Sequence, residues 1–489
     1  MCGDILEQDK IHLTACTFTP MNPLLSSLTL SGWSPDRWQR SSLLYRLAFG
    51  RLHQWRSNSL LLSASEPLGM ALVAAVLIVA PFVSTSLVGV LLGCCIAFFA
   101  LLTLTDNTRV GLTPIHTLVV LYWVVSSLAM GCSPMPRVAL SGWIKLTLYI
   151  GLFFLAARVL RRSRLRAWAI GILLLVALIT SVHGIQQSIV GVEALATWTD
   201  PTSSSAESTR IYSYLGNPNL FAGYLIPAVG LSAAACFAWQ RWLPKLLAIV
   251  MFLVNVAALI MTYSRGAWIG LVVAGFVLTL LLVWWWSDRL PTKLRPWALP
   301  GVVGLSAAVV LLAVAIVPPI RDRVATMFVG RGDSSNNFRI NVWAAVLDMI
   351  RDRPVLGIGP GNSIFNKIYP LYMRPKFSAL SSYSVLLEVT VEAGLIGLFS
   401  FLWLLYVTTY QALTQIKRLH TTRSGDAFWL MAVLASAAGL MAHGLFDTVF
   451  YRPPIQTIWW LMLAIVASFY APTFPAESEL PAETIDQGV

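Results

Sequence analysis

Apolar runs of about 20 residues alternate with short polar connections along most of this chain. Runs of this length and composition are typical of α-helices that cross a lipid bilayer. The chain contains about twelve such runs, whose boundaries the pattern predicts to within a few residues. The pattern predicts an all-α polytopic membrane protein with transmembrane helices near 67–84, 86–104, 115–132, 143–160, 168–190, 219–238, 243–262, 266–286, 298–318, 385–410, 427–448 and 455–471.

The polar segment 320–384 interrupts this pattern between the ninth and tenth apolar runs. Apolar residues recur at helical spacing within 340–350, and Pro354 follows, where a helix should stop. Asn336 and Asn337 precede the periodic stretch and suit a helix N-cap. We therefore expect one short amphipathic helix inside a large loop that lies outside the membrane.

Composition excludes an ordinary soluble globular protein, because 57% of the residues are hydrophobic, only 11% are charged and the mean hydropathy is +0.72. The net charge of +12 does not indicate nucleic-acid binding, since the basic residues cluster in short connections and no nucleic-acid motif occurs. The six cysteines show neither a disulfide framework nor metal-ligand spacing. We expect no metal and no cofactor.

Basic residues in the short connections predict the orientation, because they favour the cytoplasmic side. With a cytoplasmic N-terminus, about fourteen fall on the inner side and about five on the outer side. This distribution predicts a multi-pass protein of the cell's inner (plasma) membrane with both termini in the cytoplasm. It also places the segment 320–384 on the outer face.

The resulting organisation has five parts. The first contains apolar residues at helical spacing between Trp38 and Arg56, with interleaved arginines that suit the anionic inner leaflet. The parts are a cytoplasmic segment with this interfacial helix (1–60), nine transmembrane helices (61–319), the large extracytoplasmic loop (320–384), three further transmembrane helices (385–471) and a disordered, acidic cytoplasmic tail (472–489).

Of the few basic residues on the predicted outer side, where the insertion bias disfavours them, three arginines stand out. Arg210 precedes a turn-rich run that contains Asn217 and Asn219, Arg265 lies in a very short connection, and Arg339 opens the loop helix. Guanidinium groups suit the oxygens of carboxylates, carbonates and phosphates. The three arginines therefore predict an electropositive outer pocket for an anion, and the alternative is that they anchor helix ends.

A glycine-rich loop contains Gly357, Gly359 and Gly361. Its backbone N–H groups can converge on an anion, although no Gly-Lys-Ser/Thr follows and the loop is not a P-loop. Alternatively, it is a tight turn that packs the large loop onto the membrane domain.

Ionisable residues within the predicted spans form a second group of candidates. Glu388 and Glu392 lie four residues apart and share a helix face, as do His443 and Asp447. Ionisable groups in hydrocarbon usually face a cavity or a partner. The four residues are candidates for coupling or relaying H⁺ or Na⁺, with plain structural pairing as the alternative.

The strings around these residues resemble the O-antigen ligase and polymerase superfamily. The resemblance covers about Ser41 to Tyr470, and within the superfamily it is closest to the IctB family of cyanobacteria, to which bicarbonate transport is attributed. The strings that carry it are Arg210 with Asn217-Pro218-Asn219, Ser264-Arg265-Gly266, the run 334–343, the glycine-rich loop, Glu392-Ala393-Gly394 and the run 443–448.

One position departs from the ligases. They resemble this chain but carry a histidine at the position of Tyr383, nine residues before Glu392. A phenol with a reference pKa near ~10 is a poor general base at neutral pH. The resemblance therefore does not transfer glycosyl-transfer chemistry, but it does transfer the arginine pocket, which in the ligases is thought to hold a lipid-linked pyrophosphate.

The resemblance implies transport or accumulation of bicarbonate or another oxyanion across the lipid bilayer, with the arginines attracting the anion and the ionisable residues coupling it to H⁺ or Na⁺. No inverted repeat of the kind found in many secondary transporters occurs. One alternative is glycosyl transfer from a lipid-linked saccharide with a displaced catalytic base. Another is an accessory subunit of a carbon-uptake assembly.

Overall fold

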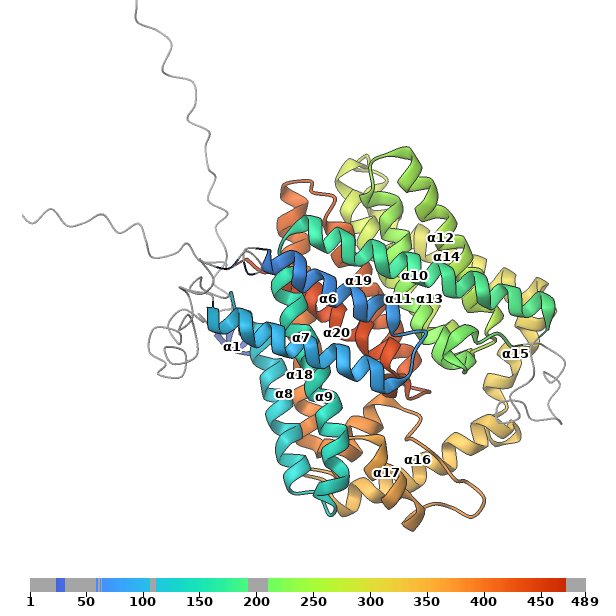
Figure 1. The fold of residues 1–489 in the computed structure, drawn as a ribbon. Coiled ribbons are helices and arrows are strands. Elements are labelled where there is room, and N and C mark those ends of the chain that lie inside the picture. The colour runs from blue at the N-terminus through green and yellow to red at the C-terminus, as the bar shows by residue number, and fades with distance from the viewer. Residues whose placement is uncertain are drawn as a thin grey trace, which may run out of the picture.

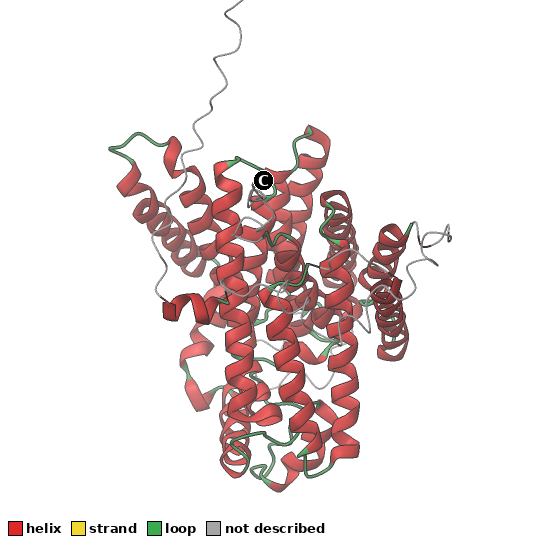
Figure 2. Ribbon diagram, turned by 90° about the vertical axis from the view of Figure 1, so that its left-hand side faces the viewer, coloured by secondary structure: helices red, strands yellow, loops and turns green. Residues whose placement is uncertain are grey.

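The computed structural model describes residues 23–30, 59, 62, 64–105, 111–191 and 210–471. This part of the chain is helical and contains no strand (Figures 1 and 2). The predicted interfacial helix at 38–56 and the tail 472–489 lie outside it. The helices are α1 (Pro23–Thr29), α6 (Ser65–Val79), α7 (Thr85–Thr105), α8 (Pro114–Gly131), α9 (Pro136–Val159), α10 (Ser163–Val190), α11 (Pro218–Ala238), α12 (Trp242–Met261), α13 (Arg265–Trp286), α14 (Arg295–Ile316), α15 (Pro318–Phe328), α16 (Ser334–Asp352), α17 (Asn362–Ile368), α18 (Val385–Thr421), α19 (Ala427–Gly444) and α20 (Pro453–Ser468).

Ten of the described helices are long and apolar enough to cross a membrane, and α6 and α20 are shorter apolar helices. Each of the twelve predicted apolar runs lies on one of these twelve helices. The all-α polytopic fold class is therefore confirmed. The division into cytoplasmic and extracytoplasmic parts stays a prediction.

Two helices form the centre of the bundle. Most of α11 and α19 is buried, at 83% and 78% of their most apolar stretches, whereas α12 and α13 are 28% and 17% buried. Small residues permit this packing, because a side chain at Gly439 of α19 would lie 2.5 Å from the backbone oxygen of Gly270 in α13. The ends of α11, α13 and α19 contribute residues to the candidate site described below.

The segment 320–384 has more structure than the single predicted helix. It contains most of α15 as well as α16 and α17. Its buried residues, among them Val342, Met349 and Phe365, form a second hydrophobic core together with Ala139 of α9 and Val391 of α18. The predicted stop is confirmed, because α16 ends at Asp352, two residues before Pro354. The predicted cap is wrong, since Asp333 accepts the N–H of Asn336 and caps the helix. The asparagine pair lies inside its first turn.

Helix α18 contains a break at Gly394, whose φ of 68° and ψ of −170° interrupt the helix. Two backbone carbonyls just before the break, those of Val391 and Glu392, accept N–H groups of Ile358 and Gly359 at 2.8 and 2.9 Å. Beyond it, the N–H of Leu395 donates to the segment after α16. The glycine-rich loop therefore fills the break and fixes where the first turns of α18 point.

Candidate functional site

The three predicted outer arginines line one cavity of about 330 Å³. It lies between the N-terminal ends of α11 and α13, the first turns of α16 and the C-terminal end of α19. We call it the arginine cavity. Its polar lining includes Arg210, Arg265, Arg339, Asn219, His443 and Asp447.

Arg210 is positioned by the capping turn of α11. Asn217 caps this helix by accepting the N–H of Asn219 at 2.8 Å. The guanidinium of Arg210 donates to Asn219 Oδ1 at 3.0 Å and to the Thr262 carbonyl at 3.1 Å. Asn219 in turn donates through Nδ2 to Asp447 Oδ2 at 2.7 Å. One amide therefore links an arginine and an aspartate that are far apart in the sequence.

Arg265 is the first residue of α13 and joins it to the large loop. Its Nη2 lies 2.9 Å from Asp333 Oδ1, and the two side chains are only 10% and 14% exposed. The same Asp333 oxygen accepts the N–H of Asn336 at 2.9 Å. A single carboxylate therefore pairs with the arginine and caps α16.

Arg339 lines the cavity from α16. Its Nε donates to the Phe446 carbonyl at 2.8 Å, and its Nη1 donates to Ser335 Oγ at 2.6 Å. Burial lowers the pKa of Arg339, and Asp447 opposes this shift. Because burial penalises the charged guanidinium, an anion placed beside it would be favoured.

His443 and Asp447 both line the cavity, but the structure shows no hydrogen bond between them. Gly223 and Gly266 leave the space that the fully buried imidazole occupies. Within the described chain neither ring nitrogen of His443 has a hydrogen-bond partner. Asp447 is 8% exposed and also accepts the N–H of Thr448 at 2.7 Å.

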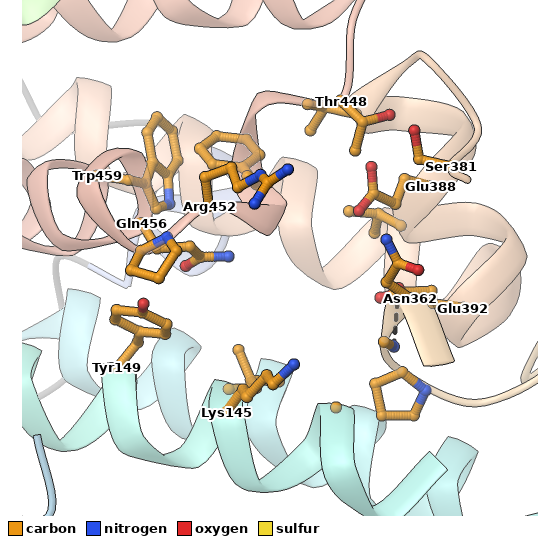
Figure 3. A pocket seen from close by; sticks show the side chains of 18 of the residues that line it. Lys145, Tyr149, Asn362, Ser381, Glu388, Glu392, Thr448, Arg452, Gln456 and Trp459 are labelled. Carbon is orange, nitrogen blue, oxygen red and sulfur yellow. Dashed lines mark hydrogen bonds between the residues drawn. The ribbon is translucent and has the colours of Figure 1, made fainter. Parts of the chain in front are cut away.

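The two glutamates line a separate cavity of about 480 Å³, seen in Figure 3. We call it the carboxylate cavity. Asn217, Gly361 and Tyr383 also line it, and Asp447 lines both cavities. Most of the predicted site residues are therefore distributed over two neighbouring cavities, with Glu388 and Glu392 lining one and the three arginines lining the other, whereas Gly357 and Gly359 line neither.

The glycine-rich loop is packed against α18. Besides the two bonds to the broken helix, the N–H of Gly361 donates to Glu392 Oε1 at 2.8 Å. Gly357, Gly359 and Gly361 have φ values of 66°, 104° and 106°, which favour glycine. This geometry agrees with the tight-turn alternative, and the carboxylate that the loop binds is that of Glu392.

Tyr383 lies against the loop helix with a left-handed φ of 52°. Its ring packs edge-on to Phe338 at 5.4 Å, and its carbonyl accepts Trp343 Nε1 at 3.4 Å. Burial, and next Asp447, raise the pKa of Tyr383 to about 12, while Arg339 opposes the shift. The phenol is therefore protonated at neutral pH, so it can donate a hydrogen bond and is a poor general base.

Sequence reasoning missed several contributors to the two cavities. Asp333 and Ser335 hold arginines from the start of α16, and an aspartate ahead of Ser-Ser-Asn-Asn is itself a capping signal. Lys145 and Arg452 line the carboxylate cavity. The sequence could have indicated Lys145 and Arg452 as site residues, because both belong to the few basic residues on the predicted outer side.

The fold and the two cavities describe a polytopic membrane protein with two cavities that are lined by charged residues. The family model described as O-antigen ligase matches residues 246–402. That match includes Arg265, Arg339, Tyr383 and both glutamates, and it supports a relationship to the O-antigen ligase and polymerase superfamily. A comparison with curated proteins found no match.

Proposed function

We propose that the arginine cavity binds the phosphate oxygens of a lipid-linked saccharide and that the protein acts on this lipid as a relative of the O-antigen ligases. One observation carries the proposal. Three guanidinium groups, from three separate segments of the chain, line a single cavity. Planar guanidinium forks match phosphate oxygens, and a partly buried cavity strengthens each contact.

The family match supports the choice of ligand, because two of the three arginines lie in the matched region. In this proposal Tyr383 donates a hydrogen bond and another group handles the proton. Asp447 suits that role, because it lines both cavities and Asn219 and the Thr448 N–H hold its carboxylate in place.

Bicarbonate transport or accumulation is the second candidate, and the charge balance favours it. Asp333 and Asp447 bond to members of the arginine cavity, so its three guanidinium groups exceed the carboxylates by one charge. That excess suits a singly charged oxyanion. In that case the anion would be coupled to H⁺ or Na⁺ by Glu388, Glu392, His443 and Asp447. The function would then be the one that the resemblance to the IctB family implies. An accessory role in a carbon-uptake assembly requires the same anion site.

We further propose the topology that the basic residues predict. The termini lie in the cytoplasm, the protein is in the inner membrane, and both cavities open toward the outer face, where a lipid-linked saccharide would be met. The large loop 320–384 then covers the site from outside.

The test uses the full chain in lipid nanodiscs. Binding of geranyl pyrophosphate, a short lipid-linked pyrophosphate, is compared with that of geraniol and of bicarbonate. The proposal predicts saturable binding of the pyrophosphate at least about tenfold tighter than that of bicarbonate, since several phosphate contacts each contribute. Tighter bicarbonate binding, together with uptake of labelled bicarbonate into proteoliposomes, would favour the second candidate instead.

A further inference from the structure

Among the described residues, three helices begin at the arginine cavity, and they differ in how their first turns are capped. The Asn217 side chain caps α11, and the Asp333 side chain caps α16. Ser264 precedes α13 and lines the cavity, but its side chain forms no capping hydrogen bond. Of the three helices, α13 therefore begins at the cavity without a side-chain cap.

The first turn of α13 directs backbone N–H groups toward this end of the helix. Its first hydrogen bond joins the N–H of Trp268 to the Ser264 carbonyl at 3.0 Å, and the N–H groups of Gly266 and Ala267 lie ahead of that bond. Such groups point out of the N-terminal end of a helix, where the helix dipole also favours an anion. A helix start alone does not identify a binding site, because water also satisfies these groups.

His443 provides the second observation. Its imidazole is fully buried and lines the same cavity. Neither ring nitrogen has a hydrogen-bond partner within the described chain. Burying a polar group without a hydrogen bond is unfavourable, and buried polar groups in native proteins are nearly always bonded. A molecule that enters the cavity would supply the partner that the imidazole lacks.

Two glycines show which edge of the imidazole lies toward the cavity. A Cβ atom on Gly266 would lie 3.6 Å from His443 Nε2, whereas a Cβ atom on Gly223 would lie 3.3 Å from Nδ1. Gly266 lines the arginine cavity, and Gly223 is not among its lining residues. Nε2 therefore lies on the side of the ring toward the cavity, next to the start of α13. A neutral imidazole with its hydrogen on Nε2 donates a hydrogen bond there.

We infer that His443 Nε2 and the first-turn N–H groups of α13 together bind one phosphate group, beside the guanidinium of Arg265. The inference deepens the proposed function, on which it rests, because it states where in the arginine cavity one phosphate of the lipid-linked pyrophosphate lies. Arg265 is the first residue of α13, so its guanidinium and the N–H groups start from the same turn. His443 is then a neutral hydrogen-bond donor to the ligand and not a residue that couples transport to H⁺ or Na⁺.

The test detects the contact between the ligand and the imidazole. The full chain, with isotope-labelled histidine nitrogens, is placed in nanodiscs with geranyl pyrophosphate, and solid-state NMR measures magnetisation transfer from phosphorus to nitrogen. The chain contains six histidines, so the His443 signal is assigned by its absence in His443→Gln. We expect transfer to a ring nitrogen of His443 in the parent protein and its loss in Arg265→Ala.

Affinities of four variants for geranyl pyrophosphate complete the test. His443→Phe keeps an aromatic ring but loses the donor, so it should bind about tenfold more weakly. His443→Gln should recover part of the affinity, because its amide donates. Gly266→Ala should also bind more weakly, since its Cβ atom would lie 2.9 Å from His443 Cδ2 and displace the ring. The matched control Gly275→Ala, on the same helix and facing open space, should bind as the parent protein does.

The outcomes separate this inference from the proposed function. Binding counts as Arg265-dependent when Arg265→Ala weakens it and Arg137→Ala, which lies outside both cavities, does not. Arg265-dependent binding without transfer to His443 would overturn the inference and leave the proposed function standing, with water as the partner of the imidazole. Unchanged affinity in His443→Phe would also overturn the inference alone. Absence of any Arg265-dependent binding would overturn both.

Discussion

Replacing Asp333 by asparagine should tighten oxyanion binding. The Arg265 guanidinium is 2.9 Å from the Asp333 carboxylate, and both side chains are largely buried. An anion that binds Arg265 must first displace this partner. Asparagine can still cap α16 by accepting the Asn336 N–H, so the helix start should be preserved. The substitution therefore removes a competing negative charge at little structural cost.

The size of the effect follows from the contact that is lost. A hydrogen bond to a charged group contributes about 1.5–3 kcal/mol. Since about 1.4 kcal/mol is a factor of ten in affinity, Asp333→Asn should tighten pyrophosphate binding by about 10- to 100-fold. Titration calorimetry in nanodiscs measures this directly. Asp333→Ala should bind tightly too but lose about 1 kcal/mol of stability with the cap.

A matched control lies on the same helix. Asp348 forms ion pairs with Arg351 and Arg374 at the exposed face of α16, and Asp348→Asn should leave affinity unchanged. Unchanged or weaker binding in Asp333→Asn would refute the reasoning. It would mean that Asp333 holds Arg265 in the orientation that the anion requires.

Three further predictions concern Tyr383, the topology and Gly394. Tyr383→Phe should retain most activity, because a phenol with a pKa of about 12 is protonated on both sides of neutrality; a loss on the order of 10²-fold would identify it as a proton-transfer group. Its pH–activity profile should match that of the parent protein below about pH 10, since the raised pKa favours the neutral form. Cysteines placed near Asn336 should react with an impermeant thiol reagent added from outside, whereas cysteines near Arg162 should not; reversed labelling would overturn the topology. Gly394→Ala should lower the free energy of unfolding by at least about 1–3 kcal/mol in thermal unfolding, because the φ of Gly394 is left-handed and a side chain there would clash with Val355. An unchanged unfolding midpoint would show that α18 can become continuous at this residue.

The helices could be predicted from the sequence because each apolar run is, by its length and composition alone, typical of a membrane-spanning helix. The meeting of Arg210, Arg265 and Arg339 in one cavity was also predictable, since each is a basic residue on the predicted outer side, where membrane insertion disfavours it. The separation of Glu388 and Glu392 from these arginines was not. Helical spacing says which residues share a face of one helix but not which helix that face meets.

The remaining differences arise from contacts between distant segments. Gly394 reads as a packing residue within an apolar span, but its backbone breaks the helix because the chain near Val355 approaches it. Likewise, Asp333 gains its second role, the ion pair with Arg265, only when the N-terminal ends of α16 and α13 meet. Such roles depend on tertiary packing, which local periodicity does not encode.

The most direct test of the central claim measures pyrophosphate affinity in single alanine variants of Arg210, Arg265 and Arg339. Each variant should bind pyrophosphate at least about tenfold more weakly than the parent protein, because each loses a charged hydrogen-bonding fork. The control Arg137→Ala should bind it as tightly as the parent protein. Arg265→Lys should lie between Arg265→Ala and the parent, since its charge remains but the bidentate geometry is lost. If the three alanine variants remain in the membrane and bind pyrophosphate with unchanged affinity, the arginines are anchors of helix ends and the arginine cavity is not an anion site.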